Sequence, residues 1–300
     1  MKKLTGEGVS LTSLCRTLGV SRHAYYSYLK TNMTKVKDDQ IIKNQIEQIA
    51  LEFPRYGYRR ITRELVRRGL KVNHKRVLRI MDENDLLCQT KKKFMVTTDS
   101  NHNLPVYPNL LKDVNGKKVT VTAINQVWVS DITYIAVAGI GPNQSSQQRF
   151  VFLAVILDLY SRKVVGWHLG EDLSSGLVIL ALRMAIERRK PSAGLIHHSD
   201  RGVQYASREY TDILKTNSVQ ISMSRKGNPY DNATCESFNK TLKADEVRLN
   251  EYENYFEAKL RIANYIENIY NRKRLHSSLD YRTPEEFENS LINNRITVPI

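Results

Sequence analysis

The chain has 300 residues, a net charge of +15 and 41% hydrophobic residues, which is the composition of a globular protein of about two domains. Its longest apolar stretch, Phe150–Leu157, is far shorter than the roughly 20 residues that span a bilayer, and its first residues do not resemble a signal peptide. Three scattered cysteines argue against a disulfide framework or a zinc site. We therefore expect a cytoplasmic protein with no membrane partner.

The positive charge is concentrated in the first third of the chain. Residues 1–93 carry 21 Lys/Arg against 9 Asp/Glu, a net charge of +12, whereas residues 94–300 carry a net charge of only +3. Such an imbalance indicates that the N-terminal third binds a polyanion, most simply DNA. The alternative is a basic surface that is merely solvated.

Residues 1–33 predict a first helix-turn-helix. A short amphipathic helix from Leu11 should end at Gly19, which tolerates the left-handed conformation of a helix C-cap. Ser21 is a good N-cap for the following helix. The start of that second helix is where a recognition helix meets a DNA groove, so the expected DNA contacts are Ser21, Arg22, Tyr25 and Tyr26.

Residues 38–90 predict a second helix-turn-helix module. Apolar residues recur at helical spacing over 39–52 and 58–68, and Asn73 can cap a third, basic helix. The alternative is a plain helical bundle with charged faces. The expected DNA contacts are Arg59, Arg60, Lys75, Arg76 and Arg79.

Residues 91–124 sustain no period and predict a linker. The linker begins with Lys91, Lys92 and Lys93, which would follow the DNA backbone. A solvated coil is equally consistent with this composition.

Residues 125–250 change to an α/β pattern. Strands are expected at 126–138, 150–159 and 163–169, followed by a helix at 174–190 and a strand at 195–198. A helix at 207–216, a strand at 219–223 and a helix at 232–247 complete the series. This order, β-β-β-α-β-α-β-α, is that of a ribonuclease-H-like fold. Residues 251–300 are expected to form a C-terminal helical extension.

Three acids stand out in this α/β region. Asp131 lies within the first strand, Asp200 follows a strand end, and Glu236, with 35 residues between it and Asp200, lies near the start of a helix. Two unit charges 4 Å apart repel by about 4 kcal/mol at an effective dielectric of 20, so a cluster of three would need cations. Oxygen ligands suit two Mg²⁺ or Mn²⁺ ions, which drive in-line displacement at phosphorus. Any one of these acids alone could equally be a helix cap or a surface charge.

Several stretches of the chain resemble a known family: Arg55–Ile61, Asn125–Tyr134, Leu157–Trp167, His198–Tyr205, Asn228–Phe238 and Tyr270–Leu279. They are similar to transposases encoded by the second reading frame (OrfB) of bacterial insertion sequences of the IS-three group, which have a retroviral-integrase-like DDE core.

The resemblance implies that Asp131, Asp200 and Glu236 are the catalytic metal ligands, with two Mg²⁺ (or Mn²⁺) ions as cofactors. It implies cleavage at the ends of an element, followed by strand transfer through a 3′-hydroxyl. The implied partners are double-stranded DNA, further copies of the chain and an upstream-frame protein, at the bacterial nucleoid. A non-catalytic DNA-binding regulator derived from a transposase is the alternative function.

Other residues lie beside the three acids. Lys240 and Lys243 follow Glu236 at i+4 and i+7, so they share its helical face and are expected to contact DNA, although ordinary surface lysines would look the same. His198 and Asn232 could orient phosphate or water, or could serve only the fold. Asp158 is tempting as a fourth ligand, but its place at a strand end favours a turn-stabilising role.

Overall fold

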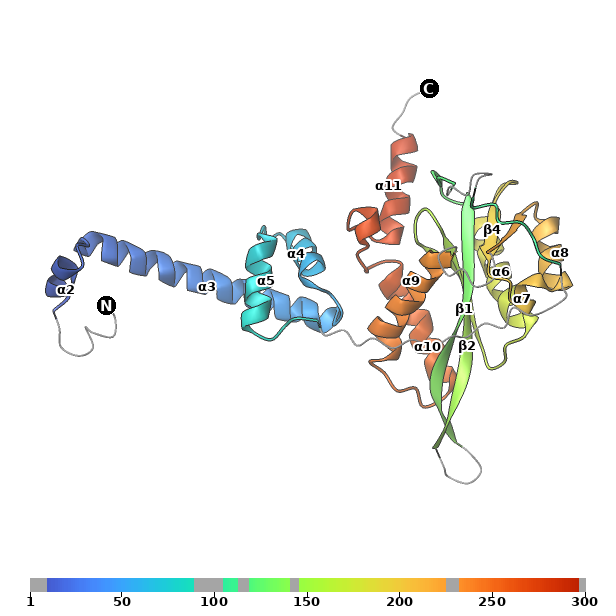
Figure 1. Cartoon of the computed structure of the whole chain (residues 1–300), viewed down its shortest axis with the longest axis horizontal. Helices are drawn as coiled ribbons and strands as arrows, with labels where there is room; N and C mark the ends of the chain where they lie inside the picture. The colour runs from blue at the N-terminus through green and yellow to red at the C-terminus, as the bar shows by residue number, and fades with distance from the viewer. Residues whose placement is uncertain (1–9, 89–104, 113–118, 141–145, 225–231, 297–300) are drawn as a thin grey trace. The chain divides into compact units, whose positions relative to one another are not determined.

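The computed structural model describes residues 10–88, 105–112, 119–140, 146–224 and 232–296. The chain divides into two compact units, Met1–Lys91 and Lys92–Ile300 (Figure 1). No described helix is long and apolar enough to cross a membrane.

The described part of the first unit is helical. The predicted turn between the first two helices is confirmed, because Gly19 has a φ of 63° and the Ser21 hydroxyl accepts a hydrogen bond from the backbone N–H of Ala24 at 3.0 Å. The second helix, however, runs without interruption through residues 33–38, where we expected one module to end and the next to begin. No proline or glycine lies between residues 22 and 52 to break it. The helices are α2 (Leu11–Thr17), α3 (Arg22–Glu52), α4 (Tyr58–Arg67) and α5 (His74–Glu83).

The C-terminal half of α3 packs with α4 and α5 around a small apolar core. Gly69 ends α4 with a φ of 89°, and the side chain of Asn73 caps α5 by accepting a hydrogen bond from the backbone N–H of Lys75 at 2.8 Å. The cap at Asn73 is the one that the sequence predicted. The fully buried side chains of this core are Ile46, Ile49, Ile61, Leu65, Val77 and Met81.

The second unit contains a five-stranded mixed sheet with strand order β3-β2-β1-β4-β5. The first three strands form the predicted antiparallel meander, and β4 and β5 join it in parallel. The two hairpin strands β1 and β2 extend further into the expected turn than the sequence indicated. The strands are β1 (Val127–Ile140), β2 (Ser146–Asp158), β3 (Val164–Gly170), β4 (Ile196–Ser199) and β5 (Gln220–Met223).

Helices cover both faces of this sheet (Figure 1). Neighbouring residues of β1 point to opposite faces. Trp128 is buried with residues of α6 and α8, whereas Val129 is buried with residues of α9 and α10. Gly166 of β3 lies so close to α6 that a Cβ atom there would be 2.3 Å from the carbonyl oxygen of Ala181. The helices are α6 (Ser175–Arg189), α7 (Val203–Ala206), α8 (Arg208–Thr216), α9 (Ala233–Leu242) and α10 (Tyr255–Asn264).

Beyond α9 the chain is helical, as expected, but irregular. Two π-helical turns occur, η2 (Lys243–Val247) and η3 (Tyr265–Tyr270), and a short 3₁₀ turn, η4 (Ser277–Leu279), precedes α11 (Pro284–Ile296).

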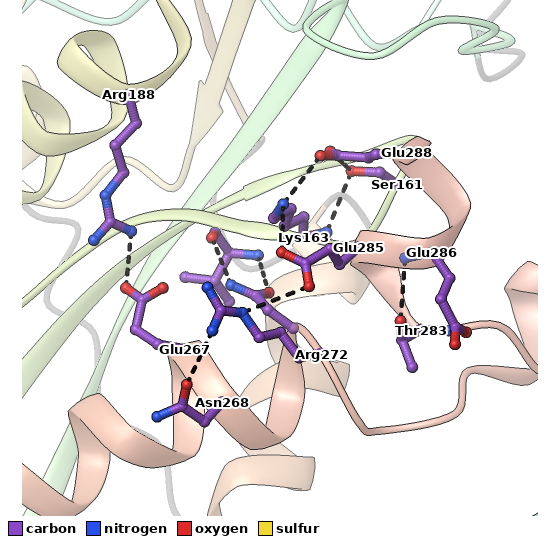
Figure 2. A network of polar contacts seen from close by, with 12 residues as sticks. Ser161, Lys163, Arg188, Glu267, Asn268, Arg272, Thr283, Glu285, Glu286 and Glu288 are labelled. Carbon is purple, nitrogen blue, oxygen red and sulfur yellow. Dashed lines mark hydrogen bonds and ion pairs between the residues drawn. The ribbon is translucent and has the colours of Figure 1, made fainter. Parts of the chain in front are cut away.

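Polar contacts fasten α11 to the turn between β2 and β3 (Figure 2). Glu288, almost fully buried, accepts a hydrogen bond from the Ser161 hydroxyl at 2.6 Å and lies 3.4 Å from the ammonium of Lys163. On η3, Glu267 accepts a hydrogen bond from Arg188 of α6 at 2.8 Å. The C-terminal extension is therefore part of the second unit and not an appendage.

Candidate active site

The fold brings the strand that carries Asp131 next to the strand that precedes Asp200. In the parallel pairing of β1 with β4, Val129 lies opposite His198, and each acid follows its paired residue by two positions. Glu236 lies on α9, the helix that packs against one face of β1. The amide of Asn232, just before α9, donates a hydrogen bond to the carbonyl oxygen of Ser130 in β1 at 2.8 Å. The three predicted acids therefore lie near one another, on the central strand β1, just beyond β4 and on α9.

The three carboxylates interact electrostatically. The pKa of Asp131 is raised from 3.8 to about 8, first by burial, then by the negative charge of Asp200, with a smaller contribution from Glu236. The backbone N–H of Ile132 and the ammonium of Lys243 oppose this rise. A carboxyl group that resists ionisation near neutral pH, because it is buried and lies beside other carboxylates, is stabilised in its charged form by a cation.

The donor set suits a divalent cation, but its present geometry does not enclose one. Among the described residues, no three His, Cys, Asp or Glu side chains are close enough together to hold a metal ion. Polar neighbours hold the carboxylates instead: Gly202 N–H donates to Asp200 Oδ1 at 2.9 Å, and the Lys240 ammonium lies 3.5 Å from Glu236 Oε2. Binding of metal would require these side chains to rotate towards one another.

Asn239 is a site residue that the sequence did not reveal to us. Its Nδ2 donates a hydrogen bond of 2.8 Å to Oδ2 of Asp131. The available signal was its helical position, because Asn239 follows Glu236 by three residues and so lies on the same face of α9. This amide holds the carboxylate of β1 against the helix that carries Glu236.

The two predicted lysines of this helical face have different surroundings. Lys240 is exposed beside Glu236. Lys243 is half-buried, with Nζ 4.1 Å from the centroid of the Tyr134 ring, a cation–π contact. Burial and the positive charge of Arg248 lower the pKa of Lys243, and Asp131 opposes this shift. Lys243 therefore lies within electrostatic reach of the acid cluster.

The polar residues beside the acids mainly serve the fold. His198 is fully buried, and its Nδ1 is 2.8 Å from the hydroxyl of Ser222 on the adjacent strand. Asn232 is also buried and anchors α9 to β1, as described above. A role for either residue in orienting phosphate or water stays a prediction.

Asp158 does what the sequence indicated. Its buried carboxylate accepts hydrogen bonds from three backbone N–H groups, those of Asn125 at 2.6 Å and of Tyr160 and Ser161 at 2.9 Å each. These bonds hold the segment before β1 to the β2–β3 turn. They support the turn-stabilising role that the sequence favoured for Asp158.

The expected DNA contacts at the start of α3 are only partly on the surface. Arg22 and Tyr26 are exposed, and Ser21 acts as the N-cap. Tyr25 is buried, contrary to our expectation, because the first turn of α3 faces α2, and its ring packs edge-on against Tyr26 at 5.6 Å. Tyr25 supports the packing of the two helices and does not present its ring to a ligand.

In the second predicted module, Arg59 and Lys75 are exposed, and the guanidinium of Arg60 lies 5.7 Å from the centroid of the Tyr56 ring. Arg76 and Arg79 both bind the carboxylate of Asp39 on α3, at 2.6 and 2.7 Å. Their charges are thus partly neutralised within the unit. Lys91, Lys92 and Lys93 lie outside the described residues.

Comparisons with known proteins identify the family of the chain. The family models of the integrase core domain match residues 121–229 and 217–284, and that of an HTH-like domain matches residues 37–94. A 31 kDa protein of insertion element IS600 from Shigella sonnei is 41% identical over 91% of this chain and 97% of its own length. Transposase InsF for insertion sequence IS3A of Escherichia coli K12 is 34% identical over 93% of this chain and 94% of its own. The chain belongs to the IS3-type insertion-sequence transposases.

The transposase is also similar to the transposase for IS904 of Lactococcus lactis, at 38% identity over 83% of this chain and 94% of that protein. Among solved structures, the catalytic core domain of BIV integrase is similar with a TM-score of 0.40 and 17% identity, covering 58% of this chain and 99% of that one. As a DDE transposase with an integrase core, the protein is a polynucleotidyl transferase that binds DNA and catalyses its transposition.

Proposed function

We propose that the transposase uses Asp131, Asp200 and Glu236 to hold two divalent cations, Mg²⁺ or Mn²⁺, at the site of phosphoryl transfer. The observation that carries this proposal is the raised pKa of Asp131, which Asp200 and Glu236 help to cause. Three coupled carboxylates without sulfur or imidazole ligands favour a hard cation.

The reaction we propose has two steps at phosphorus. Water first attacks a phosphodiester at the end of the element and frees a 3′-hydroxyl, which then attacks a second phosphodiester and joins the strands. When bound, the two cations would activate the attacking oxygen and stabilise the leaving oxygen. The chain itself positions the groups: Asn239 orients Asp131, and Lys240 and Lys243 bind DNA phosphate beside the carboxylates.

The N-terminal unit delivers the DNA in this proposal. The exposed side chains of Arg22, Tyr26, Arg59 and Lys75 are its contacts, and two copies or more assemble on the element ends, with an upstream-frame protein as a further partner at the bacterial nucleoid. The net charge of +12 on residues 1–93 supports binding to the phosphate backbone. With 6–10 phosphate contacts, affinity is expected to fall by roughly a thousand-fold or more between 50 and 200 mM salt.

One assay tests the catalytic part of this proposal. Labelled DNA carrying the element ends is incubated with the full chain and with Mg²⁺ or Mn²⁺. The wild type is expected to cleave and join strands, and Glu236→Gln to bind the same DNA without doing either. The matched control is Glu209→Gln, an exposed glutamate at the start of α8.

The outcomes are distinct. Cleavage without joining would support a nuclease, and binding without either reaction would support a non-catalytic regulator. Full activity of Glu236→Gln would show that the ligand assignment is wrong.

A further inference from the structure

The catalytic helix α9 does not continue as a regular α-helix. At its end lies the π-helical turn η2, in which the backbone N–H of Arg248 donates to the carbonyl of Lys243, five residues back, at 3.0 Å. Such turns are rare within helices and often occur at functional sites. Lys243 is the first residue of this turn, so the turn determines where its side chain lies.

An ion pair that is largely buried joins η2 to the C-terminal segment of the chain. The guanidinium of Arg274 donates to Oδ2 of Asp245 at 2.7 Å, and the Tyr265 hydroxyl lies 3.3 Å from the same oxygen. Only 6% of the Arg274 side chain and 16% of the Asp245 side chain are exposed. Removing one partner of such a pair leaves an uncompensated buried charge, so the two residues depend on each other.

The same C-terminal segment contacts α9 a second time. The ring of Tyr270 packs edge-on against Phe238 of α9, with centroids 4.8 Å apart. Arg274 is itself held by a backbone hydrogen bond to Ile269 of 2.7 Å. The stretch Tyr270–Leu279 is one of the segments that resemble the family. It contacts α9 before Lys243, through Tyr270, and η2 after Lys243, through Arg274.

We propose that Arg274 and Asp245 are positioning residues that place Lys243 over Tyr134, beside the acid cluster. Asp245 follows Lys243 by two residues within the same turn, so a shift of η2 moves Lys243 away from the ring. The functional consequence rests on the proposed role of Lys243 in binding DNA phosphate. A lysine at position 274 would keep the charge but carries no Nε–H at the same place, so it would not reproduce this hydrogen bond.

Nuclear magnetic resonance tests the placement without any reaction. Lysines of the full chain are reductively dimethylated with ¹³C-formaldehyde and a borane reductant, and the Lys243 signal is assigned by its loss in Lys243→Arg. Methyl groups above an aromatic ring are shielded, so this signal is expected upfield of the other lysines in the wild type. In Asp245→Asn and Arg274→Lys it is expected to return to the common position.

Arg188→Gln is the control variant. Arg188 binds Glu267 on η3, so the variant weakens the anchoring of the C-terminal extension but does not touch η2 (Figure 2). Its Lys243 signal should remain upfield. Thermal unfolding shows whether each variant is folded. If Asp245→Asn does not fold, Arg274→Lys still tests the contact, because it keeps the positive charge opposite Asp245. An upfield signal that persists in a folded Arg274→Lys would overturn the proposal.

Strand joining on unmethylated protein then tests the consequence. A displacement of about 1 Å in a positioned group lowers rates by about a hundred-fold, so Arg274→Lys is expected to lose at least ten-fold in turnover at saturating DNA, with a smaller loss of DNA affinity because Lys243 is one of several expected phosphate contacts. If the Lys243 signal moves but joining is unchanged, the placement stands and the proposed role of Lys243 is wrong.

Discussion

Replacing Asp131 with asparagine is expected to make the metal-free transposase more stable at pH 8, while abolishing its activity. The folded-state pKa of Asp131 is about 8, against an ordinary value of 3.8. Both states bind the proton below about pH 4 and both release it above about pH 8. Between these limits the unfolded state ionises more readily, so the stability contributed by this group falls as pH rises.

The magnitude follows from the size of the shift. Each pKa unit corresponds to about 1.4 kcal/mol, so an unscreened shift of this size would destabilise the folded protein by about 5–6 kcal/mol above pH 8. The side chain is only partly buried by its exposed area, and solvent screening reduces this figure to about 2 kcal/mol. For a unit of this length, about 2 kcal/mol raises Tm by about 4–8 °C.

Thermal unfolding in a chelating buffer measures the effect, at about pH 4 and at pH 8. Asp131→Asn should unfold at the same temperature as the wild type at the lower pH and at a higher temperature at pH 8. Added Mg²⁺ or Mn²⁺ should stabilise the wild type more than the variant, because the variant lacks one carboxylate ligand. A difference in Tm that is equal at both pH values would refute the electrostatic reasoning.

Three further substitutions test individual contacts. Asp158→Ala leaves three backbone N–H groups without their acceptor and should lower the free energy of unfolding by about 3 kcal/mol in a denaturant titration. Gly166→Ala inserts a methyl group 2.3 Å from a carbonyl of α6 and should destabilise by about 2 kcal/mol or more, whereas an unchanged Tm would contradict that close packing. Asn239→Ala removes the amide that holds Asp131 and should slow strand joining about ten-fold with DNA binding unchanged; equal rates would exclude a positioning role.

Much of the catalytic unit could be predicted because its signals are local. A continuous apolar run marks β2, and enrichment in Val, Ile, Tyr and Trp marks β1, so the order of the strands along the chain followed from patterns of a few residues. Asp131 lies within β1, Asp200 directly follows β4 and Glu236 lies in the first turn of α9, and this order of elements brings the three segments near one another. Within the described residues of this unit, the helix α7 (Val203–Ala206) was not predicted, because a single turn is too short to show a period.

What could not be predicted depends on contacts between distant segments. Nothing local to Arg274 indicates that its partner is Asp245, or that a π turn follows α9. The burial of Tyr25 is set by the packing of α2, and the neutralisation of Arg76 by Asp39 joins residues 37 positions apart. A basic residue at helical spacing indicates a position on the surface of the helix. Only the folded structure shows whether an acidic side chain forms an ion pair with it.

The uninterrupted helix α3 has a consequence for how this protein would read DNA. A helix of 31 residues is about 46 Å long and turns by about 100° per residue, so its two ends keep a constant separation and a constant angular phase. Arg22 and Tyr26 lie at one end, and the helices that carry Arg59 and Lys75 pack at the other. Two DNA segments contacted by these ends would have to be spaced by a fixed number of base pairs. The length of α3 would then set the distance between the two DNA contacts. One extra base pair between the segments, or one extra residue in α3, would rotate one contact surface relative to the DNA groove that it meets.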